Sequence, residues 1–118
     1  MYGLPKDFDE AAFVGQELVQ VSFSVNTIHF VFDGKASLTL LSTFIYSPSL
    51  NDAVHRETVP VSSSGLMELI GNKVKSARAT SDGQLTLVFE NGGSLTCVDD
   101  SIEYESYYIC IGDKEIIV

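Results

Sequence analysis

Basic residues are scarce in this chain. Its 118 residues include 7 Lys and Arg against 16 Asp and Glu, which gives a formal net charge of −9 at pH 7. Nucleic-acid binding draws on lysine and arginine contacts to phosphates, so this balance argues against a nucleic-acid partner. The same charge permits a basic protein as a partner, because opposite charges steer two surfaces together.

The chain has no long apolar segment either. No run approaches the roughly 20 apolar residues of a membrane-spanning helix, and the first residues do not follow the signal-peptide pattern. We therefore expect no membrane association and a cytoplasmic location. The only cysteines, Cys97 and Cys110, lie in apolar strand-like segments and are expected to be buried, reduced thiols.

Motifs of catalysis and cofactor binding are also missing. The sequence contains no G-x-S-x-G, no G-x-G-x-x-G, no C-x-x-C and no H-x-x-x-H. His29 and His55 are its only histidines, and a zinc site would require three or four Cys, His, Asp or Glu ligands at short spacing. We therefore expect a protein that is not an enzyme and that binds neither a metal nor a cofactor.

What the sequence does contain is an internal repeat, over about residues 13–46 and 69–98. Gly15 corresponds to Gly71, and the alternating segment 28–32 (Ile-x-Phe-x-Phe) corresponds to 85–89 (Leu-x-Leu-x-Phe). Alternation of apolar and polar residues is typical of half-buried strands. Each copy is therefore predicted to be a three-stranded antiparallel meander that hides its apolar face against the other copy.

Shorter elements surround the two meanders. Helix caps and stops predict a short helix before Gly15 and another over residues 66–70. The third strand of the first copy is expected to run from residue 36 toward residue 46. Residues 47–64 read as a long connection in which 55–59 forms an edge strand, and residues 104–118 read as a C-terminal hairpin.

The predicted fold is a mainly β single domain over residues 1–118, with two short helices. The two meanders pack as a sandwich or as a flattened barrel, and the C-terminal hairpin closes the structure. The predicted core is the apolar face of the matched strands, formed by Phe23, Phe30, Phe32, Leu38, Leu85, Leu87, Phe89 and Leu95.

One segment combines carboxylates with tyrosines and is the candidate interface. Tyrosine buries a large area while keeping a polar group, and carboxylates steer a basic partner. Alternation places Tyr104 and Tyr108 on one face of the strand and Tyr107 on the other. A metal site here lacks the order of a calcium loop. The predicted protein interface is Asp99, Asp100, Glu103, Tyr104, Glu105, Tyr107 and Tyr108.

Both ends of the chain carry a resemblance. The opening segment 7–21, the Phe30-x-Phe32 strand and the closing pattern Y-E-S-Y-x-I…I-I-V over residues 104–118 resemble a group of small uncharacterised bacterial proteins with a duplicated β-meander and no established function. The resemblance implies a bacterial cytoplasmic protein with a repeated β fold, and it supplies no catalytic residue.

Three function classes remain open from the sequence. The first is a non-enzymatic protein-binding module whose partner is an unknown protein, with a basic protein and a second copy in a homodimer as the alternatives. The second is an immunity-type inhibitor of a basic toxin. The third is a small-ligand binder or enzyme that uses the groove between the repeats, which would require convergent polar groups around an apolar pocket.

Overall fold

The computed structural model describes residues 3–49, 54–59, 65–101 and 105–118, and these residues form an all-β structure of ten strands. The strands are β1 (Leu18–Phe23), β2 (Ile28–Phe32), β3 (Ala36–Leu40), β4 (Thr43–Ser47), β5 (His55–Thr58), β6 (Val74–Ala79), β7 (Leu85–Phe89), β8 (Ser94–Cys97), β9 (Tyr107–Ile111) and β10 (Lys114–Ile117). Two single turns of 3-10 helix, η1 (Glu10–Phe13) and η2 (Leu66–Leu69), precede β1 and β6.

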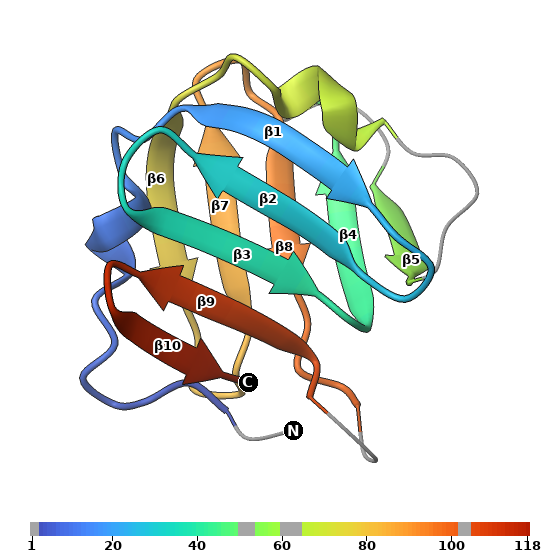
Figure 1. Cartoon of the computed structure of the whole chain (residues 1–118). Helices are drawn as coiled ribbons and strands as arrows, with labels where there is room; N and C mark the ends of the chain where they lie inside the picture. Colours follow the sequence, from blue (N-terminus) through green and yellow to red (C-terminus); the bar gives the residue numbers. More distant parts are fainter. Residues whose placement is uncertain (1–2, 50–53, 60–64, 102–104) are drawn as a thin grey trace.

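The strands form two antiparallel five-stranded sheets. Sheet I has the order β1-β2-β3-β9-β10, and sheet II has the order β5-β4-β8-β7-β6. Figure 1 shows sheet I in front of sheet II, with the strands of the two sheets running in different directions. Each described sheet ends at two edge strands, so the sheets are open and the flattened barrel considered from the sequence is wrong.

The two three-stranded meanders form as the alternating pattern predicts, β1-β2-β3 in sheet I and β6-β7-β8 in sheet II. Each is completed by a hairpin from the other half of the chain. The β9–β10 hairpin pairs with β3, whereas the β4–β5 hairpin pairs with β8. The predicted C-terminal hairpin is therefore present, and it extends sheet I.

Both sheets contribute to one apolar core. Strands β2, β3 and β7 bury every second residue, as expected for strands with one covered face. Seven of the eight predicted core residues are buried: Phe30, Phe32, Leu38, Leu85, Leu87, Phe89 and Leu95. The prediction for Phe23 is wrong, because Phe23 lies on the edge strand β1 and is 44% exposed.

The two sheets are joined where the segments 15–18 and 71–74 run side by side. The N–H of Gly15 donates to the Val74 carbonyl at 2.8 Å, and the N–H of Gly71 donates to the Leu18 carbonyl at 2.7 Å. Two further bonds link Leu18 to Asn72 and Val74 to Gln16. We call this four-bond contact the clasp; it fixes the starts of β1 and β6 against each other.

Two further predictions need correction. The expected short helices are single 3-10 turns, because each is stopped after one turn by a glycine with positive φ, +86° at Gly15 and +88° at Gly71. The expected third strand of the first copy ends at Leu40. After Leu41 and Ser42 the chain enters sheet II as β4, so its continuation toward residue 46 pairs with β8 instead.

Candidate functional site

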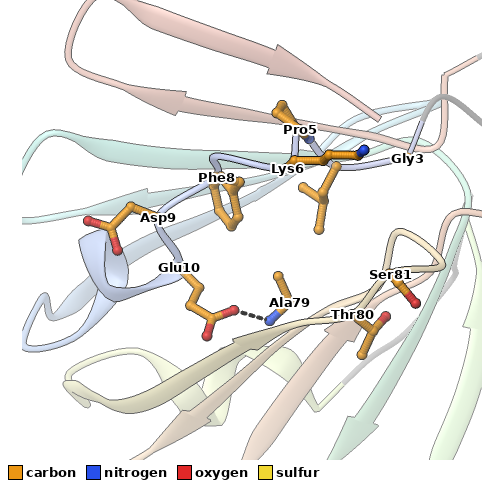
Figure 2. A pocket seen from close by; sticks show the side chains of 10 residues that line it. Gly3, Pro5, Lys6, Phe8, Asp9, Glu10, Ala79, Thr80 and Ser81 are labelled. Atoms are coloured by element: carbon orange, nitrogen blue, oxygen red, sulfur yellow. Dashed lines mark hydrogen bonds between the residues drawn. The ribbon is translucent and has the colours of Figure 1, made fainter.

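A pocket of about 650 Å³ lies between the N-terminal segment and the end of β6. Figure 2 shows the N-terminal segment on one side and the β6–β7 turn on the other. Its lining mixes apolar and polar groups: Gly3, Leu4, Pro5, Lys6, Phe8, Asp9, Glu10, Ala79, Thr80 and Ser81. The sequence-based hypothesis placed a ligand groove between the repeats, so this pocket has a different location.

The N-terminal segment is fastened over the edge of β6. Asp9 caps η1 by accepting the Ala11 N–H at 3.1 Å, and this orients the next residue, Glu10, toward the strand. The Glu10 carboxylate accepts the backbone N–H of Ala79, as the dashed line in Figure 2 shows. At the other end of the segment, the Gly3 N–H donates to Asp99 at 2.7 Å.

The predicted acidic surface is held together by internal bonds. The Asp99 carboxylate accepts hydrogen bonds from Gly3 and from the Ser106 hydroxyl, the latter at 3.1 Å. The Asp100 carboxylate accepts the Ser42 hydroxyl at 2.9 Å and pairs with Arg56 at 3.7 Å. These two carboxylates therefore join the segment after β8 to the N-terminal segment, to the start of β9, to the β3–β4 connection and to β5. Of the two, only Asp100 is exposed.

Of the remaining predicted interface residues, Glu103 and Tyr104 lie outside the described residues. Glu105 is half-buried. Tyr108 is half-buried on the outer face of sheet I, opposite Thr39.

Tyr107 cannot contact a partner, because its side chain is fully buried in the core. Its hydroxyl donates to the Gly83 carbonyl in the β6–β7 turn, and burial raises the pKa of that hydroxyl. Its assignment to an interface is therefore wrong, although the predicted opposite orientation of Tyr107 and Tyr108 is confirmed.

The other candidates for chemistry are scattered. His29 shares a 2.7 Å hydrogen bond with Thr39 on sheet I, and His55 stacks on Tyr46 at the edge of sheet II. Burial raises the pKa of the Cys97 thiol, which disfavours the reactive thiolate. Within the described ranges, no three His, Cys, Asp or Glu side chains come together as a metal site.

The sheet edges differ in charge, and this difference singles out β1. Three of the four edge strands carry charged side chains: β5 has Arg56 and Glu57, β6 has Lys75 and Arg78, and β10 has Lys114 and Glu115. Charged edge residues discourage pairing with another chain. Strand β1 has none, and its exposed side chains include Val19 and Phe23.

The backbone of β1 is also open toward solvent. The Ser24 N–H donates to the Thr27 carbonyl at 3.0 Å. Bonded and non-bonded pairs alternate along an antiparallel ladder, so Ser22 bonds to β2 while Val21 and Phe23 direct their N–H and C=O groups away from it. No hydrogen bond to these outward groups occurs among the residues that the structure describes.

Sequence reasoning missed this edge because it treated β1 as a covered strand. The available signal was the absence of any charged residue from Leu18 to Phe23 in a chain with a net charge of −9. That signal becomes informative only when the sheet order identifies β1 as an edge.

One comparison with known proteins places the chain in a family. A family of unknown function, DUF6188, matches residues 9–118. The chain belongs to this family. The DUF6188 match covers both sheets and the β1 edge but begins inside the N-terminal segment, after Phe8. No curated protein and no solved structure matches the chain.

None of the helical turns in the described part of this DUF6188 protein has the length and apolar character to cross a bilayer.

Proposed function

We propose that this protein is a non-enzymatic protein-binding module that associates through the outer edge of β1. The observation that supports the proposal is the combination of open backbone groups and uncharged, exposed apolar side chains on this one edge. An extended segment of a partner would pair with β1 as an additional strand of sheet I. Backbone hydrogen bonds would supply affinity, and the side chains of Val19, Val21 and Phe23 would supply selectivity.

We propose further that the fold is a sandwich of two duplicated units. The clasp supports this, because each of its bonds has a counterpart in which the two segments exchange roles. Both β1 and β6 also begin with a register shift, between Leu18 and Gln20 and between Val74 and Ser76. In this arrangement β1 and β6 are equivalent edges, and among the described residues η1 covers β6 more extensively than η2 covers β1.

We place the protein in the bacterial cytoplasm, without a cofactor. The support is chemical: Cys97 and Cys110 do not form a disulfide, and a reducing compartment keeps such thiols free.

The test compares two edge strands of the same sheet. Phe23 on β1 and Ile117 on β10 are each 44% exposed, so Phe23→Lys and Ile117→Lys introduce the same charge at matched exposure. Proteins from a bacterial extract that bind the immobilised wild type are identified, purified and titrated against each variant by calorimetry. A partner that binds wild type and Ile117→Lys, but binds Phe23→Lys at least tenfold more weakly, supports the proposal.

Equal affinity of every purified partner for Phe23→Lys and Ile117→Lys would refute binding at β1. Both variants are first shown to keep the far-ultraviolet circular dichroism of the wild type, so that a loss of affinity is not a loss of fold.

A further inference from the structure

We infer that the segment that pairs with the β1 edge is β1 of a second copy, in an antiparallel arrangement whose two-fold axis passes beside Ser22. The inference rests on the proposed function and specifies its partner. A continuous ten-stranded sheet would result, with sheet I of each copy forming one half.

The register of β1 is compatible with itself. Pairing about Ser22 brings Val21 opposite Phe23 of the second copy, and these are the two residues whose backbone groups point outward. Two-fold symmetry makes the same pair occur twice, once on each side of the axis. Val21 and Phe23 both lie opposite buried residues of β2, on the core side of sheet I. The pairs would therefore extend the apolar core from one molecule into the next.

The same register matches the exposed side chains that flank these pairs. It brings Val19 close to Val25, which lies in the turn between β1 and β2 and is 80% exposed. An apolar contact between these two side chains would add buried area at each end of the strand pair. Ser22 lies on the two-fold axis, directly opposite Ser22 of the second copy. Two residues on the axis approach each other most closely, and the small serine side chain leaves room for this approach.

The absence of charge on β1 favours a second copy over an unrelated basic partner at this edge. The chain carries a net charge of −9, so most approaches of two copies are repulsive. Because β1 has no charged residue, pairing two copies there does not bury an unpaired charge. A basic protein attracted by the acidic surface would gain nothing from an uncharged edge.

The equivalent edge at β6 is closed by its own chain. The Glu10 carboxylate accepts the outward N–H of Ala79, and η1 packs against β6. The position in η2 that corresponds to Glu10 is Leu66, whose side chain is buried in the core and has no carboxylate to offer. Contact between η2 and β1 is also less extensive than contact between η1 and β6.

A single strand pair is a small contact, so the expected dimer is reversible. Stable interfaces bury about 1,600 Å² in total, and one six-residue edge provides less. We therefore expect sedimentation equilibrium of the full chain to show a mass that rises with concentration from 12.9 kDa toward twice that value. Phe23→Lys and Val25→Lys should both remain monomeric, whereas Ile117→Lys should associate like the wild type.

Using both Phe23→Lys and Val25→Lys separates a loss of association from a loss of fold. Phe23 packs partly on the core, but Val25 lies beyond the end of β1 and is far more exposed, so Val25→Lys should leave the unfolding midpoint unchanged. A wild type that stays at 12.9 kDa at every concentration would overturn the inference, as would a Val25→Lys variant that associates normally.

Cross-linking tests the register. In a Cys110→Ser background, Ser22→Cys should form a disulfide-linked dimer on mild oxidation, because directly opposed residues of a non-hydrogen-bonded pair are about 4.5 Å apart at Cα. Ser24→Cys is the control, since the two copies of residue 24 would be roughly 13 Å apart along the strands. Equal cross-linking of both variants would contradict pairing about Ser22.

The outcomes also separate this inference from the proposed function. A monomeric wild type that still binds a different protein, in a manner abolished by Phe23→Lys, would reject the second copy as partner and retain β1 as the binding edge. A dimer that is insensitive to Phe23→Lys, together with partners that are equally insensitive, would reject both.

Discussion

Replacing Tyr107 by phenylalanine should destabilise the protein although it removes a single atom. The ring stays in the core, so no large cavity forms, but the Gly83 carbonyl loses the hydroxyl that donates to it. A buried hydrogen bond contributes about 1 kcal/mol net, and an unsatisfied buried acceptor costs about 1–3 kcal/mol. We therefore expect the free energy of unfolding to fall by about 1–3 kcal/mol, a large share of the 5–15 kcal/mol typical of small domains.

The neighbouring residue provides the control. Tyr108 lies on the same strand but faces outward and is half-buried, so water can replace a partner that its hydroxyl loses. Tyr108→Phe should therefore change the free energy of unfolding by at most about 0.5 kcal/mol.

Urea unfolding followed by circular dichroism measures both variants, which suits a protein without tryptophan. A loss of about 2 kcal/mol lowers the midpoint by about 1 M urea, given a dependence of 1–3 kcal/mol per molar. Equal midpoints for Tyr107→Phe and Tyr108→Phe would refute the role of the Tyr107–Gly83 bond.

Three further predictions concern the core, the N-terminal segment and alkaline pH. Phe30→Ala should lower the free energy of unfolding by about 3–5 kcal/mol, because the ring is fully buried; a loss below 1 kcal/mol in urea unfolding would contradict its place in the core. Glu10→Ala should cost about 1 kcal/mol and speed hydrogen exchange of the Ala79 amide, whereas Glu10→Gln, which keeps an acceptor oxygen, should cost less. Burial raises the pKa of Tyr107 above its ordinary value of 10.0, so the stability this group contributes is complete below pH 10 and is lost as the pH rises beyond it. Wild type should therefore lose stability above pH 10 more steeply than Tyr107→Phe, as measured by urea midpoints on both sides of that pH.

Local patterns predicted the strands well because strands and tight turns depend on residues that are close together in the sequence. The alternation in 28–32 and 85–89 fixed which side chains face the core, and the turn at Asp82-Gly83 set the end of β6. The edge strand predicted over residues 55–59 from the proline that follows it is present as β5.

Long-range pairing could not be predicted in the same way. The adjacent apolar residues Leu40 and Leu41 do not by themselves indicate that the chain leaves sheet I there. The strands that join β4 and β9 to the rest of their sheets, β8 and β3, are far away in the sequence. The candidate site failed for the same reason. Tyr107 and Phe23 are both aromatic residues in alternating segments, and only the sheet order reveals that Tyr107 lies in a central strand and Phe23 at an edge.

The exchange of hairpins between the two halves of the chain has a consequence for cooperativity. Sheet I needs β9–β10 from the C-terminal half, and sheet II needs β4–β5 from the N-terminal half. Neither half can therefore be complete while the other is unfolded. If one half of the chain unfolds, the sheet formed by the other half loses a two-stranded hairpin. Half-folded states should therefore be too unstable to accumulate. The interlocked topology makes the two sheets open and close as one thermodynamic unit.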